Sequence, residues 1–208
     1  PDYCFPNTLE SVLALQSAVE HNPAAPRAPY YLGNFWYAHR RYEEAIECWE
    51  QAARLDPAFS IPFRNLGLAY FNKLGDADRA LEAYETAHRL APEDARVFFE
   101  LDQLYKKRNL APAERLARLE ACPGLVAARD DLTVEYINLL LLAGRHAEAL
   151  AILTTRAFHP WEGGEGKVTG AYVSCLVEQA REAIASGAFQ SAIALLNRAQ
   201  GYPPNLGE

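Results

Sequence analysis

The stretch YYLGNFWYAHRRYEEAIECWEQAARLDP, residues 30–57, decides the fold of this chain. Small residues stand at Gly33, Ala45 and Ala52, with large aromatic residues between them. Small side chains let two helix axes approach closely, and the aromatic residues fill the remaining space. The stretch ends at Pro57, and a proline disfavours a helical conformation in the residue before it. The pattern therefore predicts two antiparallel helices joined by a tight turn.

The same pattern recurs along the chain. The pair Leu66-Gly67 follows Leu32-Gly33 at a spacing of 34 residues, whereas Ala80 follows Ala45 at a spacing of 35. The second copy therefore holds one extra residue, which we place in the turn near residues 73–76, because a surface turn absorbs an insertion at low cost. Recurrence at such a spacing is typical of stacked helix hairpins, since one hairpin cannot bury both of its faces.

We expect an all-α protein with a single repeat domain over residues 1–208. Asn7-Thr8 is a suitable N-cap for its first helix. That helix matches only the second half of a repeat, and the chain lacks an initiator methionine, so we expect it to be part of a longer protein. The expected divisions are a half-repeat at 9–21, repeat 1 at 26–59, repeat 2 at 60–93, a degenerate repeat 3 at 94–122, repeat 4 at 130–157, an inserted loop at 158–167 and repeat 5 at 168–200.

Composition excludes several classes of protein. The net charge of −7 argues against a nucleic-acid partner, and the sequence contains no apolar run long enough to span a membrane. Four cysteines lie far apart without a Cys-x-x-Cys pair, and the histidines lack the spacing of metal ligands. We therefore predict no metal and no cofactor, and a reducing, cytoplasmic setting in which cysteines act as small buried residues.

The chain resembles the tetratricopeptide repeat (TPR) family. The resemblance rests on the motif residues of two consecutive copies, which are Leu32-Gly33, Ala45, Ala52 and Pro57, then Leu66-Gly67, Tyr70, Ala80, Ala87 and Pro92. It implies a right-handed α-solenoid of about five hairpins plus a half-repeat, whose first helices line a concave groove that binds proteins or peptides.

A second resemblance is to the TPR portion of large bacterial proteins that also carry a β-sandwich domain of unassigned function. It rests on the stretches PDYCFP, RNLGLAYFNK, ELDQLYK, FHPWEGGEGKV and YPPNLGE. This resemblance implies that the chain is one part of a longer bacterial protein. In that reading the ending Asn205-Leu206-Gly207-Glu208 is not a solubilising cap.

The family register implies which first-helix residues face the groove. They combine aromatic, amide and basic side chains, as a peptide-binding surface does. The groove candidates are Tyr30, Asn34, Tyr37, Arg64, Phe71, Arg96, Phe99, Gln103 and Lys106. The alternative is that the aromatic members only pack the interior of a narrow superhelix. A receptor for chaperone tails is disfavoured, because Glu100 stands where such a clamp needs a cation and would repel a terminal carboxylate.

The stretch FHPWEGGEGK, residues 158–167, interrupts the repeat rhythm. Its candidate residues offer stacking, charge and acid–base chemistry, and they are His159, Trp161, Glu162, Glu165 and Lys167. Three glycines permit unusual backbone angles. The loop is either structural, with Trp161 filling a hairpin interface and Glu165 capping the next helix, or it contacts a neighbouring domain. A third reading is direct catalysis by Glu162 and Glu165, which is disfavoured because carboxylate catalysis needs a fixed separation of the two groups.

Two functions follow from these observations. The first is a non-catalytic scaffold that binds a protein, a peptide or another domain of the same parent chain through the concave groove. The second is a helical accessory domain of a larger carbohydrate-active enzyme, with the loop at 158–167 reaching a neighbouring active site. In both cases we expect no catalytic residue within this chain.

Overall fold

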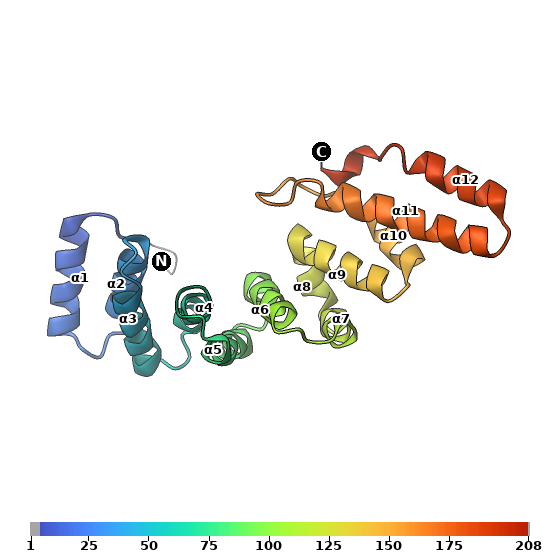
Figure 1. Cartoon of the computed structure of the whole chain (residues 1–208). Coiled ribbons are helices and arrows are strands. Elements are labelled where there is room, and N and C mark those ends of the chain that lie inside the picture. Colours follow the sequence, from blue (N-terminus) through green and yellow to red (C-terminus); the bar gives the residue numbers. More distant parts are fainter. Residues whose placement is uncertain (1–4, 208) are drawn as a thin grey trace. The chain divides into compact units, whose positions relative to one another are not determined.

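The computed structural model describes residues 5–207, which contain helices and no β-strand. The prediction of an all-α fold is confirmed (Figure 1). Cys4 and the first residues of the PDYCFP stretch lie outside the described part of the chain. The helices of residues 5–207 are α1 (Leu9–His21), α2 (Arg27–Ala38), α3 (Tyr42–Leu55), α4 (Ser60–Ala69), α5 (Ala77–Leu90), α6 (Ala95–Lys107), α7 (Pro112–Glu120), α8 (Pro123–Ala128), α9 (Asp130–Leu142), α10 (His146–Thr155), α11 (Lys167–Ala185) and α12 (Phe189–Arg198).

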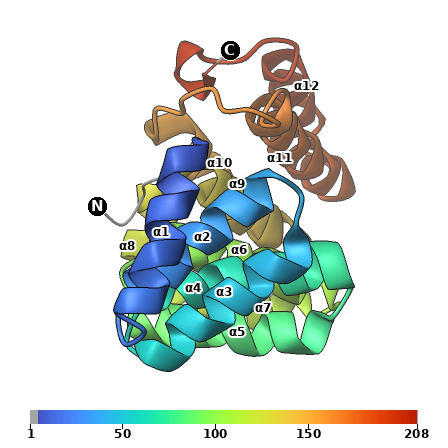
Figure 2. The same cartoon turned by 90° about the vertical axis from the view of Figure 1, so that its left-hand side faces the viewer.

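The chain divides into two compact units, residues 1–104 and 105–208. Within each unit, consecutive helices form antiparallel hairpins that stack on their neighbours, which is the construction of an α-solenoid (Figure 1). In unit 1 the hairpins are α2 with α3 and α4 with α5. In unit 2 they are α9 with α10 and α11 with α12, and the last two helices lie side by side in both views (Figures 1 and 2). The repeat boundaries and the single domain over 1–208 stay predictions.

Glycine and alanine allow the close approach of the paired helices in unit 1. A Cβ atom added to Gly33 would lie 2.4 Å from Trp49 Nε1, and one added to Gly67 would lie 2.6 Å from Tyr84 Cδ2. The alanines Ala45 and Ala80 are completely buried. Each hairpin therefore presses an aromatic ring of its second helix onto a glycine of its first helix. Such contacts cannot tolerate even one extra methyl group without a shift of the ring.

The extra residue of the second repeat does not lie in the turn. It is accommodated by a π-helical segment, η1 (Tyr70–Leu74), that continues directly from α4. A π-helical turn carries one residue more than an α-helical turn, so it absorbs an insertion while the helix continues. The segment closes with Gly75 at a φ of 68° and with a hydrogen bond from Asp76 N to Tyr70 O of 2.9 Å. The predicted location, residues 73–76, overlaps this segment, but the extra residue is accommodated by a π-helical turn and not by a longer connection, because residue spacing alone does not distinguish the two.

The first helix of unit 1 is capped as predicted. Thr8 Oγ1 accepts a hydrogen bond from Ser11 N at 3.2 Å, which satisfies one of the free amides at the start of α1. The helix packs against α2 and buries Val12, whereas Leu9 is 69% exposed and Leu13 is 57% exposed. Figure 2 shows α1 lying along α2. Only one side of α1 is therefore covered within the described part of unit 1.

Unit 2 departs from the sequence prediction after α7. Helix α7 ends at Glu120, and Pro123 then starts the short helix α8, which we did not predict. Thr133 joins this helix to α9, because its Oγ1 donates to Val126 O at 2.6 Å. None of the helices in the described residues is both long enough and apolar enough to cross a membrane.

Candidate functional site

First-helix residues of unit 1 surround a hollow of about 230 Å³. Tyr30, Asn34 and Tyr37 lie at helical spacing on one face of α2, and Arg64 lies on the corresponding face of α4. Arg96 reaches the hollow from the first turn of α6. Five of the predicted groove residues are thus brought together around one hollow.

Two buried amides form the floor of this site. Asn34 is 5% exposed and Asn65 is 8% exposed. Asn65 Nδ2 donates to Asn34 Oδ1 at 3.2 Å, and Trp49 Nε1 donates to the same oxygen at 3.1 Å. The Asn34 carbonyl therefore accepts two internal hydrogen bonds. Such a network holds both amide side chains in a fixed orientation beside the hollow, because a buried polar group loses free energy if its partner moves away.

Charged side chains at the site are paired with one another. Arg64 Nε donates to Glu100 Oε2 at 2.6 Å, and Arg64 Nη2 pairs with the other oxygen of the same carboxylate. Arg96 Nε donates to Glu100 Oε1 at 3.1 Å. Both side chains of the Arg64–Glu100 pair are 17% exposed, so water screens this pair only in part. Asp94 also lines the hollow, so the two guanidinium groups stand beside two carboxylates and the site carries no net charge from these four residues.

The pairing of Glu100 with Arg64 and Arg96 gives a different reason for disfavouring a receptor for chaperone tails, which is competition for the arginines and not repulsion by Glu100. Glu100 does not stand as an isolated repulsive charge, because it binds Arg64 and Arg96. A terminal carboxylate would have to compete with Glu100 for the same guanidinium groups. The bidentate arrangement of Arg64 on Glu100 makes that exchange unfavourable.

Aromatic rings form another wall of the hollow. The Tyr37 ring packs on Trp49 with a centroid distance of 5.4 Å and on Tyr42 at 5.2 Å. Burial raises the pKa of the Tyr37 hydroxyl, and the nearby Lys73 opposes this effect. Tyr30 is only 1% exposed, and its ring packs on Phe59. Tyr37 is the more accessible ring of the two.

Four groove candidates do not line the hollow. Phe71 lies in the π-helical segment, and Phe99 and Gln103 lie further along α6. Lys106 belongs to unit 2, where its Nζ donates to Glu135 Oε1 at 2.6 Å. Burial raises the pKa of Glu135, but hydrogen bonds from Lys106 and Arg115 outweigh it, so the pKa lies below its usual value.

Phe5 also lines the hollow, although the repeat pattern does not point to it as a site residue. Its side chain is 69% exposed although it is large and apolar. An aromatic residue placed just before a helix cap was the available signal, but spacing within the repeats says nothing about a segment outside them. The hollow also receives Ile61 and Leu68 from α4, which add apolar surface.

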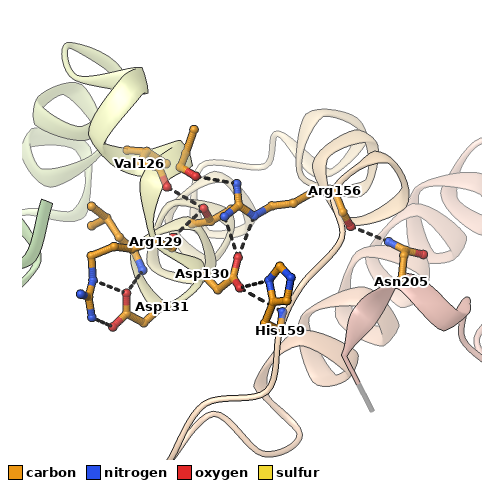
Figure 3. A network of polar contacts seen from close by, with 10 residues as sticks. Val126, Arg129, Asp130, Asp131, Arg156, His159 and Asn205 are labelled. Carbon is orange, nitrogen blue, oxygen red and sulfur yellow. Dashed lines mark hydrogen bonds and ion pairs between the residues drawn. The ribbon is translucent and has the colours of Figure 1, made fainter.

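In unit 2, polar contacts fix the first part of the loop at 158–167. Arg156 donates from Nε to Asp130 Oδ1 at 2.9 Å and from Nη1 to Ala127 O at 2.9 Å. His159 approaches the other oxygen of Asp130, with its backbone N at 2.9 Å and its Nδ1 at 3.2 Å (Figure 3). Burial raises the pKa of Asp130, yet the hydrogen bonds from His159 and Arg156 lower it below its usual value overall.

The C-terminal segment holds the same loop from another side. Asn205 Nδ2 donates to Arg156 O at 2.7 Å (Figure 3). The same Nδ2 donates to Leu153 O at 2.8 Å. Phe158 N in turn donates to Asn205 O at 2.8 Å, and Leu206 is 2% exposed. This segment covers the end of α10 and the start of the loop, and whether it serves as a solubilising cap stays a prediction. A sequence pattern gave no sign of this because the partners lie about 50 residues apart.

The loop candidates gather around a second hollow of about 490 Å³. His159, Trp161, Glu162 and Glu165 line it, whereas Lys167 stands at the first position of α11 and does not. The Trp161 ring lies against Gly164, where an added Cβ would be 2.3 Å from Trp161 Cε2. Trp161 thus packs within its own loop. The N-cap of α11 is Gly166 rather than Glu165, with Gly166 at a φ of 70°.

Comparison with known proteins supports the repeat assignment. A TPR repeat model matches residues 36–73, and a tetratricopeptide repeat model matches residues 65–94. The chain is 33% identical over 97 residues to tetratricopeptide repeat protein 37 of Xenopus laevis, a match that covers 44% of this chain. It spans only 6% of the length of that relative.

Solved structures with the same fold cover nearly all of the chain. The structure of YrrB, described as a TPR protein with an unusual peptide-binding site, aligns with a TM-score of 0.64 and 18% identity over 90% of this chain and 91% of that one. PilF of Pseudomonas aeruginosa aligns with a TM-score of 0.57 and 18% identity over 93% of this chain and 84% of that one. At this identity the likeness shows the fold alone. The chain is therefore an all-helical protein of the α-solenoid type that contains tetratricopeptide repeats.

Proposed function

We propose that this chain is a non-catalytic scaffold and that the hollow of unit 1 binds an extended segment of a partner protein or of another domain of the same parent chain. The observation that carries the proposal is the meeting of Tyr37, Arg64 and Arg96 above two buried asparagines. This combination offers a ring for contact area and oriented donors for polar groups.

The size of the hollow favours a peptide over a small molecule. Its volume of about 230 Å³ is smaller than the ~300–1,000 Å³ that is usual for small-molecule pockets. One or two side chains of an extended segment would fill it. The pairing of Arg64 and Arg96 with Glu100 supports a binding role and not a catalytic one, because these charged groups orient one another. YrrB, whose fold this chain shares, is described as having a peptide-binding site, which agrees with the proposal.

The test is a selection of peptides from a random display library on the immobilised chain, followed by fluorescence anisotropy with the selected peptides. We expect Arg96→Ala to weaken binding about fivefold or more, since truncation of a central contact costs more than about 1 kcal/mol. Arg64 would still neutralise Glu100, so the fold should persist. Arg54→Ala is the matched control, because Arg54 is an exposed arginine of α3 outside the hollow. Equal binding by all three proteins would exclude the hollow as the site.

A second function concerns the loop of unit 2. We infer that the loop at 158–167 can present a contact surface to a neighbouring domain, such as that of a carbohydrate-active enzyme, because the clamp of Asp130, Arg156 and Asn205 limits its freedom. A loop held in this way is a better contact surface than a freely moving one. If the loop contributes to the sugar site of that neighbouring domain, titration with neutral oligosaccharides should change the tryptophan fluorescence of the chain saturably. The same titration of Trp161→Phe should show no change, and a response that persists in this variant would locate the binding elsewhere.

The cellular compartment and the bacterial source of the protein are also proposals. We infer a cytoplasmic, bacterial protein, and the free thiols of Cys48 and Cys175 agree with a reducing compartment. The net charge of −7 agrees with a protein partner rather than a nucleic acid. A fractionation experiment with an antibody against the chain would check the compartment.

A further inference from the structure

Phe5 stands out among the residues around the hollow of unit 1. It lines the hollow together with Tyr37, Ile61 and Leu68, although it lies ahead of the first helix of the chain. The side chain keeps 69% of its surface exposed, in contrast to the 1% of Tyr30 in the same wall. A large apolar side chain that is held so loosely is not part of the core, and it can leave at little cost.

The position of Phe5 follows from the anchored start of α1. Thr8 caps this helix through the bond from Ser11 N to Thr8 Oγ1, and Val12 N donates to Thr8 O at 3.3 Å. The capped helix packs on α2, which also supplies Tyr30, Asn34 and Tyr37 to the hollow. Only Pro6 and Asn7 separate Phe5 from the cap, so Phe5 remains close to the hollow whether or not its ring lies against it.

We propose that Phe5 is an intramolecular occupant of the aromatic end of this hollow, and that the partner is an extended protein segment which places an aromatic side chain there after Phe5 has left. The inference rests on the peptide-binding function proposed above and names the chemistry of its ligand. The rings of Tyr37 and Trp49 and the apolar side chains of Ile61 and Leu68 form a wall that suits an aromatic ring. The nearby Arg64 and Arg96 supply cations that also favour a ring in this place.

A tethered side chain competes strongly even when its own contact is weak. A short tether holds its group at an effective concentration of roughly millimolar. The apparent dissociation constant of a ligand rises in inverse proportion to the fraction of molecules whose site is open. If Phe5 occupies the hollow in about nine of ten molecules, removal of its ring strengthens ligand binding about tenfold, and occupancy in two of three molecules corresponds to about threefold.

The test uses the full chain and a fluorescent peptide with the sequence of residues 1–8, in which Cys4→Ser prevents oxidation. We expect the Phe5→Ala chain to bind this peptide about three to ten times more tightly than the wild-type chain does. A peptide that carries Phe5→Ala should fail to bind either chain. The matched control is the Phe189→Ala chain, because Phe189 is 62% exposed on α12 of unit 2 and the substitution is the same. That control should bind as the wild type does.

Peptides from the display library separate this inference from the proposed function. If they bind the Phe5→Ala chain more tightly than the wild type and lose affinity with Arg96→Ala, both are supported. If they bind both chains equally and still depend on Arg96, the inference is overturned and the proposed function stands. If the residue 1–8 peptide fails to bind the Phe5→Ala chain, the inference is likewise overturned. If no library peptide binds either chain through the hollow, the proposed function fails, and the inference fails with it.

Discussion

Replacement of Gly67 by alanine tests the close helix contact on which the repeat depends. The added Cβ would lie 2.6 Å from Tyr84 Cδ2 and 2.8 Å from both Cγ and Cε2 of the same ring. Tyr84 is only 4% exposed, so its ring has little room to move away. Overpacking of this kind costs about 1–3 kcal/mol, whereas alanine is favoured over glycine inside a helix by about 0.8–1.0 kcal/mol. With three ring carbons in the way, we expect a net loss of about 1–2 kcal/mol in the free energy of unfolding.

The matched control is the same substitution where space is available. Gly170 lies in α11, and an added Cβ would meet no atom within 4 Å. Gly170→Ala should therefore stabilise the protein by roughly 0.4–1 kcal/mol. Urea unfolding followed by circular dichroism measures both effects. Hydrogen exchange of the amides of α4 and of α11 then assigns each effect to its own unit, because repeat proteins can lose structure in parts.

A double-mutant cycle completes this prediction. In the Tyr84→Ala background the ring is absent, so Gly67→Ala should no longer destabilise the protein, and the coupling energy should reach about 1–3 kcal/mol. A Gly67→Ala protein that is as stable as Gly170→Ala would refute the reasoning. Additive effects of Gly67→Ala and Tyr84→Ala would refute it equally, because they would show that the ring does not limit the size of residue 67.

Two further predictions concern ionisable groups. The folded pKa of Asp130 lies below its usual value, so its carboxylate stabilises the fold above about pH 4, and this contribution is lost as the pH falls through the folded pKa. Asp130→Asn should therefore lower the free energy of unfolding at pH 7, by a margin that shrinks at pH 3 in urea titrations. Burial raises the pKa of the Cys48 and Cys175 thiols to about 11. At pH 8 roughly one thiol in a thousand is then ionised, so iodoacetamide should modify both slowly until urea unfolds the chain, as mass spectrometry of digests would show.

The helix hairpins were predictable because their signals are local. Small residues at Gly33 and Gly67 recur beside aromatic residues of the next helix, and the repeat spacing places them opposite one another. Thr8 was identified as a cap for the same reason, since a cap and its amides lie within one turn. The prediction of a longer turn for the inserted residue was wrong, because a π-helical turn and a longer connection have the same spacing in sequence.

The candidate site was predictable only in part. The repeat register placed Tyr37, Arg64 and Arg96 on inward faces, and the structure brings them to one hollow. The repeat register did not reveal that Glu100 binds both arginines, because side-chain conformation decides that pairing. The register also could not show which of its positions line the hollow. Phe71 has the expected spacing, but it lies in the π-helical segment and does not line the hollow.

The order of small and large residues along the chain was enough by itself to determine the class of fold, because helix pairing depends on spacings shorter than one repeat. Tertiary structure alone decided the contacts between distant segments. It brought Phe5 to the hollow of unit 1, and it joined Asp130 to Arg156 and Asn205 to the loop of unit 2. Such contacts depend on which distant segments of the chain the folded backbone brings together, and a periodic sequence pattern holds no information about that.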